Sequence, residues 1–166
     1  MPANVVTKVL ENTNESTRKL INQFLNYPED SAGSIMTIEY VGLRKEMTVG
    51  QAIKQIKETG IDKETIDTCY VMDSNRILEG IVSIRKLILN DDTTELKDIM
   101  DTSVIYVNTH DDQEDVADLF KKYDFFVMPV VDNERRLVGI VTIDDILDVI
   151  EQENTEDLQR MAAMQP

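Results

Sequence analysis

Three acidic residues near the C-terminus have the spacing of side chains that share one face of a helix. Glu153, Glu156 and Asp157 stand at i, i+3 and i+4 in an acidic segment in which Thr155 is a candidate N-cap, and residues three or four apart are neighbours on a helix surface. Their like charges repel, and a bound divalent cation would remove that repulsion. Carboxylates without nearby Cys or His suit a hard divalent ion. The same spacing also fits a solvated acidic helix, so both interpretations stay open.

More acidic residues surround a helix predicted over 111–123. Asp112 and Glu114 stand at its start and Asp124 just after its end. From Asp111 to the C-terminus there are fifteen acidic residues against five basic ones, which accounts for −10 of the net charge of −15. Nucleic acids and anionic membranes bind basic surfaces. The composition therefore argues against both as partners.

The residue inventory argues against an enzyme. One Cys and one His among 166 residues give no nucleophile–base set and no zinc spacing. We expect Cys69 to be a small apolar strand residue and His110 a surface or capping residue. No apolar run reaches the roughly 18 to 20 residues of a membrane helix, no signal peptide is recognisable, and the low cysteine content suits a reducing cytosol.

A second kind of site is indicated at a strand-to-helix junction, where Thr142 is followed three residues later by Asp145. The segment 124–150 that positions them predicts a strand, a polar turn, a second strand and a helix. Residues 70–88 match residues 129–147 at one fixed offset. The chain is therefore predicted to be a tandem duplication of one supersecondary unit.

The two copies differ at the junction. Gly80 matches Gly139, where the second strand needs no side chain, but Ser83 and Lys86 stand where the second copy has Thr and Asp. Only the second copy thus keeps the carboxylate. Each copy has one apolar strand face and one apolar helix face, so packing the copies back to back buries both. The predicted fold class is α/β (α+β).

Other segments flank the duplication. Residues 2–26 predict two short helices whose apolar stripes need a further partner, and 27–33 reads as a linker. The first copy has a longer insertion, 60–68, than the second. We also expect Ile146, Leu147 and Val149 to be incompletely covered by one pair of copies, which predicts a dimer.

Two copies that each end in G-I-V-[ST]-I-x-x-[IL] resemble a pair of CBS domains. The segments LNYPEDSAGSIMT and DDILDVIEQENTEDLQRM are similar to the MgtE family of magnesium channels. This resemblance implies four parts: the end of an N-terminal helical domain with its linker (1–33), two CBS repeats (34–93 and 94–150), and the start of a connecting helix (151–166). It implies a regulatory module on the cytoplasmic face of the cell membrane.

The resemblance also implies ligands and partners. The implied partners are a second copy of the chain, the helical domain and a transmembrane pore that Mg²⁺ would hold shut. The implied Mg²⁺ ligands are Asp112, Glu114, Asp124, Asp145, Glu153, Glu156 and Asp157. An adenine nucleotide, ATP above all, is expected at Tyr70, Arg85, Phe125, Thr142, Asp145 and Asp148. The alternative is a nucleotide-binding CBS energy sensor that regulates an attached enzyme or transporter without a metal switch.

Overall fold

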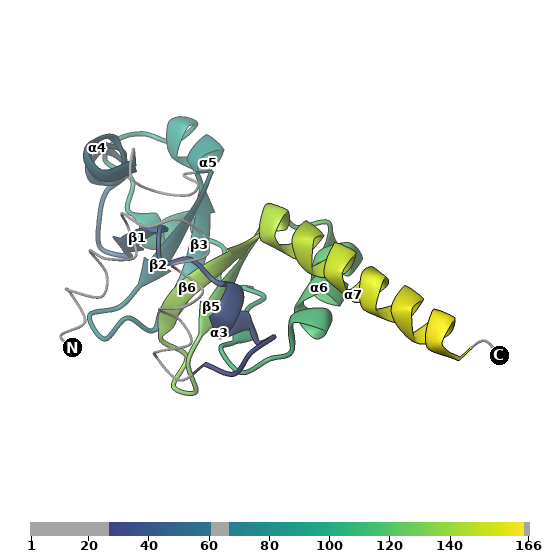
Figure 1. The fold of residues 1–166 in the computed structure, drawn as a ribbon. Coiled ribbons are helices and arrows are strands. Elements are labelled where there is room, and N and C mark those ends of the chain that lie inside the picture. Colours follow the sequence, from purple (N-terminus) through teal and green to yellow (C-terminus); the bar gives the residue numbers. More distant parts are fainter. Residues whose placement is uncertain (1–26, 61–66, 165–166) are drawn as a thin grey trace.

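Two similar three-stranded sheets form the centre of the computed structural model, which describes residues 27–60 and 67–164 (Figure 1). In the first sheet β1 (Val41–Arg44) pairs parallel with β2 (Thr68–Met72), which pairs antiparallel with β3 (Leu78–Ser83). The second sheet repeats this order with β4 (Val107–Asn108), β5 (Val127–Val131) and β6 (Leu137–Thr142). The mixed α/β class predicted from the sequence is confirmed.

The strand registers confirm the duplication. Tyr70 lies opposite Ile81 in the first hairpin, and Pro129 lies opposite Ile140 in the second, at the offset found in the sequence. Both hairpins also have a register irregularity near the end of the leading strand. The two copies are therefore the same structural unit, down to a local distortion.

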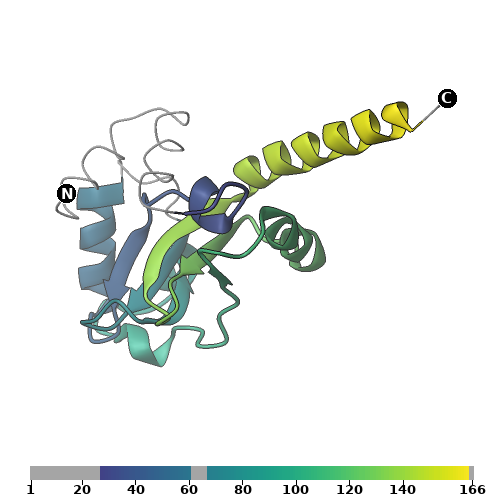
Figure 2. The ribbon, with the colours of Figure 1, turned by 60° about the horizontal axis from the view of Figure 1, so that its bottom comes forward.

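Side-chain caps set the starts of four helices, because a helix begins with backbone N–H groups that lack intrahelical partners. In the first copy Thr48 caps α4 (Val49–Thr59) and Ser83 caps α5 (Ile84–Ile88). In the second, Asp112 caps α6 (Gln113–Tyr123) and Thr142 caps α7 (Ile143–Ala163). The shorter elements are α3 (Ala32–Ile35) and η2 (Leu96–Asp98). Figure 2 shows the helices around the sheets.

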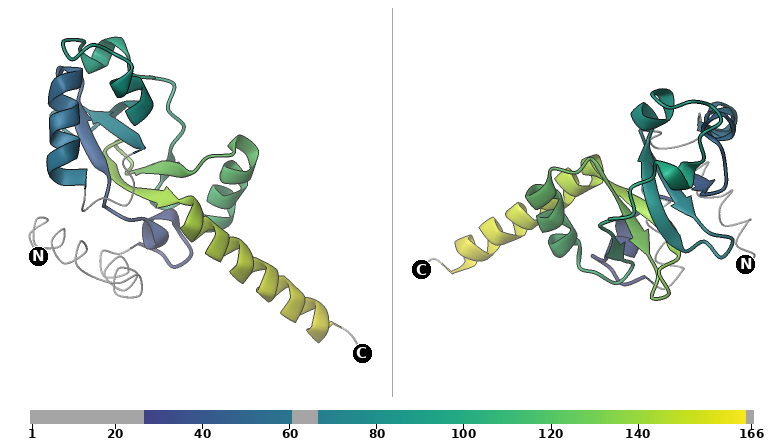
Figure 3. Two further views of the ribbon diagram at one scale, coloured as in Figure 1. Left: turned by 90° about the horizontal axis from the view of Figure 1, so that it is seen from above. Right: turned by 180° about the vertical axis from the view of Figure 1, so that it is seen from behind.

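Helix α7 runs unbroken past residue 150 and extends away from the sheets (Figures 1 and 3). The prediction of Thr155 as an N-cap is wrong, because its hydroxyl donates to the carbonyl of Glu151 within the helix. Thr142 is the N-cap instead. None of the helices in the described part of the chain is both long and apolar enough to cross a membrane. The predicted helices over 2–26 lie outside the described residues.

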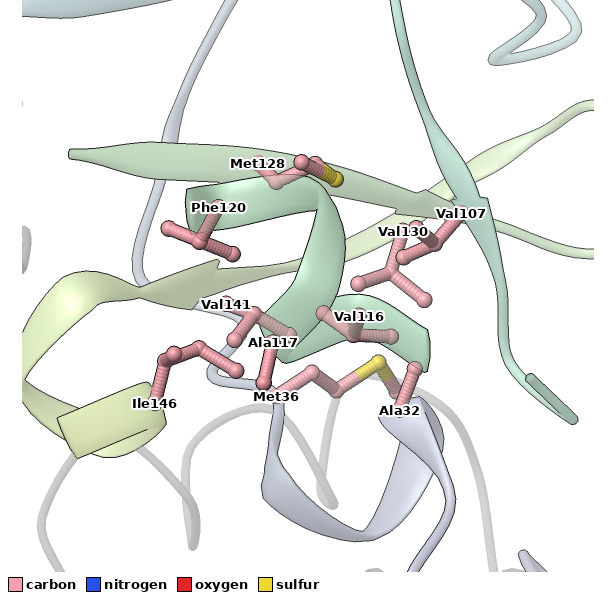
Figure 4. Close-up of a cluster of buried hydrophobic side chains, with 10 residues drawn as sticks. All are labelled: Ala32, Met36, Val107, Val116, Ala117, Phe120, Met128, Val130, Val141 and Ile146. Atoms are coloured by element: carbon pink, nitrogen blue, oxygen red, sulfur yellow. The ribbon is translucent and has the colours of Figure 1, made fainter. Parts of the chain in front are cut away.

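The hydrophobic core has three clusters. In the second copy, Phe120 of α6 and Ile146 of α7 point into one cluster together with Met36 (Figure 4). The first copy has its own cluster, which includes the fully buried Cys69, as expected for a small apolar strand residue. A third cluster joins the two sheets through residues of both copies, and its buried members are Tyr70, Leu78, Val131, Leu137 and Ile140.

The segment before each sheet packs on the other copy. Thr37 forms a β-bridge with Ile140, and Asp101 forms the equivalent bridge with Ile81. A Cβ atom on Gly139 would lie 2.9 Å from the carbonyl oxygen of Thr37. The sequence prediction that Gly139 needs no side chain is confirmed, and the close approach of this crossing segment is the reason.

Candidate functional site

The start of α6 faces the middle of α7, and acidic side chains meet there. Asp112, the N-cap of α6, accepts a 2.8 Å hydrogen bond from the backbone N–H of Glu114. The carboxylate of Glu153, above all, raises the pKa of Glu114 above its ordinary value, with smaller contributions from desolvation, Asp112 and Asp157. A raised pKa means that ionisation is disfavoured by nearby negative charge. Carboxylates from the two helices therefore repel one another at this contact.

The seven predicted metal ligands do not gather at one point. Asp112, Glu114, Glu153 and Asp157 meet at the contact between α6 and α7, whereas Asp124 ends α6 in a left-handed conformation with φ of 55°. Because α6 has eleven residues at about 1.5 Å each, Asp124 lies far from that contact. Asp145 lies in the first turn of α7. Across 27–60 and 67–164, no three Asp, Glu, His or Cys side chains are arranged to hold a metal ion.

A buried amide lies among these acids. The side chain of Gln113 donates from Nε2 to Oδ1 of Asp30 and to Oε1 of Glu153, at 3.2 Å each. Sequence reasoning missed both Gln113 and Asp30. One signal was present: Gln113 is the only uncharged residue in the run from Asp111 to Asp115.

Two neighbouring hollows lie between the copies near the start of β5. One, of about 280 Å³, is lined by Tyr70 and Phe125, and the other, of about 230 Å³, by Thr142. They share Thr68, Phe126 and Val127. Three of the six predicted nucleotide residues thus border one continuous region. Phe126, 81% exposed, was not predicted.

The other three predicted nucleotide residues do not line these hollows. Arg85 and Asp148 lie exposed on α5 and α7. The carboxylate of Asp145 accepts a 3.1 Å hydrogen bond from the hydroxyl of Thr142, which also caps the helix by accepting from the backbone N–H of Asp145. Ser83 caps α5 in the same way, through the N–H of Lys86.

The hydroxyl of Tyr70 is a buried polar group in this region. The side chain is fully buried, and within the described part of the chain the hydroxyl has no hydrogen-bond partner. Burial raises the pKa of the phenol, with a smaller contribution from Cys69. The ring of Tyr40 packs edge-on against the ring of Tyr70, with 6.0 Å between the ring centroids. A buried hydroxyl without a partner is costly, so a ligand that accepted this hydrogen bond would gain affinity.

Comparisons with known proteins agree with this architecture. A family model described as CBS domain matches residues 32–91 and 96–152. The chain is 47% identical over 148 residues to the magnesium transporter MgtE of Thermus thermophilus and 43% identical over 144 residues to that of Enterococcus faecalis, covering 89% and 87% of this chain. It spans about a third of the length of these relatives, 33% and 32%.

A solved structure is similar as well. The cytosolic domain of the Mg²⁺ channel MgtE in complex with ATP superimposes with a TM-score of 0.75 at 45% identity. The match covers 86% of this chain and 57% of that one. The match therefore shows that the two proteins share this fold over most of the chain.

Proposed function

The chain belongs to the CBS domain family, and on that premise we propose that it is the cytosolic regulatory part of a magnesium channel, which senses Mg²⁺ through the acids where α6 meets α7. One observation carries the proposal. The carboxylate of Glu153 lies 3.2 Å from the side-chain amide of Gln113 at the start of α6, and its charge raises the pKa of the neighbouring Glu114. Two opposed carboxylates on separate helices store repulsion that a divalent cation can relieve.

The donor chemistry fits Mg²⁺. All the candidate ligands are carboxylates, and Mg²⁺ prefers oxygen ligands and retains several waters, so a few acids are enough to hold it. When bound, the ion supplies the positive charge that lets the acidic faces approach. The remaining ligands would come from the helical domain or from a second copy, and we expect Asp124, Asp145 and Glu156 to bind the ions shared with them.

The proposed regulation follows from the repulsion. With Mg²⁺ abundant, α7 stays against α6, and the attached pore at the cytoplasmic face of the membrane is held shut. When Mg²⁺ is scarce, the repulsion between the carboxylates is not relieved, α7 is held less tightly against α6, and the pore opens. A ligand shifts such an equilibrium only by its difference in affinity for the two states, and the acid contact supplies that difference.

Thermal unfolding tests the proposal. Millimolar Mg²⁺ should raise the melting temperature and protect 151–163 from protease, because a ligand that binds only the compact form stabilises it. K⁺ at equal ionic strength should do much less, since it screens charge without bridging. Glu153→Gln combined with Glu156→Gln should reduce the Mg²⁺ response.

The matched control is Glu46→Gln combined with Glu58→Gln, which removes two exposed acids of the first copy. The Mg²⁺ response of this variant should equal that of the unchanged chain. A response that survives the α7 double change, or that vanishes equally in the control, would contradict a sensor at the contact between α6 and α7.

We further propose that the region between the copies binds an adenine nucleotide. The support is that Tyr70, whose buried hydroxyl has no hydrogen-bond partner among residues 27–60 and 67–164, lines the 280 Å³ hollow together with Phe125. An aromatic ring stacks on a base through its face, which contributes about 1 to 3 kcal/mol. The exposed side chain of Arg85 could turn toward phosphate, and Thr142, Asp145 and Asp148 could hold the ribose.

Calorimetry with ATP tests this second role. ATP should bind one site per chain, and Phe125→Ala should weaken binding about tenfold or more. Tyr106→Ala is the control, because Tyr106 is an aromatic residue, 44% exposed, that does not line either hollow. Heat of binding that is absent for ATP, ADP and AMP alike would leave Tyr70 and Phe125 with a packing role only.

A further inference from the structure

Gln113 is buried where the chain is most acidic. It is the first residue of α6 and is 1% exposed. Its backbone N–H donates to the carbonyl of Asp30 at 2.8 Å, and its side-chain Nε2 contacts the carboxylates of Asp30 and Glu153 at 3.2 Å each. Three separate segments of the chain therefore meet at one side chain.

The chemistry of the carboxamide suits this place. A primary amide has two N–H donors on one nitrogen, so a single uncharged group can bond both carboxylates at once. Hydrogen bonds to an ionised acceptor are stronger than those between neutral groups. A Lys or Arg would need desolvation of its charge here, and an apolar residue would leave two like charges without a donor.

Asp30 is held firmly on its side of the contact. It adopts a left-handed conformation with φ of 63°. Immediately after it, Ser31 forms a β-bridge with Asp112, and the N–H of Ala32 donates to the carbonyl of Asp111 at 2.8 Å. The segment that leads into the first repeat is thus attached to the start of α6, and the amide of Gln113 extends the attachment to α7.

We propose that Gln113 is a positioning residue that couples the segment entering the repeats, at Asp30, to the middle of α7, at Glu153, without a metal ion. The neutral amide joins the two carboxylates by donating a hydrogen bond to each, whereas a cation would join them through its charge. A displacement of one segment is thereby transmitted to the other. This coupling does not rest on the proposed magnesium function, because it acts with metal removed.

Hydrogen–deuterium exchange of the full chain in excess EDTA tests the coupling. Gln113→Met keeps the size of the side chain and removes both donors. It should speed exchange about threefold to tenfold in peptides covering 30–35 and 150–157, while peptides of β2, β3 and β5 stay unchanged. Gln152→Met is the matched control, since Gln152 is an exposed residue of α7, and it should leave 30–35 unchanged.

A double-mutant cycle separates coupling from simple loss of packing. Asp30→Ala should speed exchange in 150–157, and Glu153→Ala should speed exchange in 30–35. Both remote effects should disappear when Gln113 is already Met. If Asp30→Ala and Glu153→Ala each change only their own segment, or if the remote effects persist without the amide, Gln113 does not couple the two and the proposal is overturned.

Discussion

Thr37 and Ile140 exchange two backbone hydrogen bonds of 2.8 Å, one in each direction, although they belong to different copies of the repeat. Asp101 and Ile81 form the equivalent pair at 2.8 and 2.9 Å. The segment that precedes the sheet of each copy therefore pairs with the last strand of the other copy. The glycines Gly139 and Gly80 permit this approach, because a Cβ there would lie 2.9 and 3.0 Å from the carbonyl oxygens of Thr37 and Asp101.

Gly139→Ala should consequently destabilise the fold. The added methyl would press on backbone, which cannot rotate away as a side chain can, so we expect a loss of about 1 to 3 kcal/mol in the free energy of unfolding. Gly80→Ala should cost a similar amount. Urea denaturation followed by circular dichroism measures both. Gly42→Ala is the control, because its Cβ would meet mainly the terminal methyl of Met72, which can move.

Glu114 should give the protein a stability that depends on pH. Its pKa is raised, chiefly by Glu153, and a carboxyl with a higher pKa in the folded than in the unfolded state destabilises the folded state once ionised. That destabilisation is complete above the raised pKa and absent below the ordinary value of about 4.3. In EDTA, Glu114→Gln should raise the melting temperature at pH 7, and the gain should shrink as the pH falls toward 4.

The control for Glu114 is Glu58→Gln, a change at an exposed glutamate of α4. Its melting temperature should follow that of the unchanged chain over the same pH range. A gain from Glu114→Gln that is equal at pH 4 and pH 7 would show that electrostatic repulsion is not its cause.

Tyr70→Phe should have opposite effects on the empty and the ligand-bound protein. It removes a buried hydroxyl that has no partner within the described residues, so the ligand-free protein should gain up to about 1 to 3 kcal/mol in its free energy of unfolding. Affinity for an adenine nucleotide should fall in the same variant. Thermal unfolding with and without ATP measures both. A stability loss without ligand would mean that the hydroxyl has a partner in solution.

The surface that the sequence predicts for a dimer is mostly buried within the chain, so a dimer would have to form through other residues. Ile146 and Val149 are buried within the chain, at 0% and 4% exposure, so of the three residues named for this surface only Leu147 stays exposed. Ile88, the last residue of α5, and Leu89, which follows it, are exposed as well, at 68% and 72%. Analytical ultracentrifugation should show a dimer, and Leu89→Glu should weaken it at least tenfold. Leu158→Glu on distal α7 is the control and should leave it intact.

Much of the candidate site was predictable because it depends on local pattern. The spacing of Glu153 and Asp157 predicts a shared helix face, and α7 carries both. Thr142 and Asp145 were placed correctly at a strand-to-helix junction, since capping residues act within one turn. The prediction of Thr155 as a cap failed for a related reason: a threonine hydroxyl can bond the carbonyl four residues earlier, so it is tolerated inside a helix that continues.

The sequence by itself determined the repeat, its strands and helices, and the crowding of charge near the C-terminus, because periodicity and turn chemistry act over a few residues. Only the tertiary structure decided which segments meet. Met36 and Thr37 pack on the copy that follows them by a hundred residues, and Gln113 joins Asp30 to Glu153. Such contacts depend on how two packed sheets orient their flanking chains, and no short stretch of sequence carries that information.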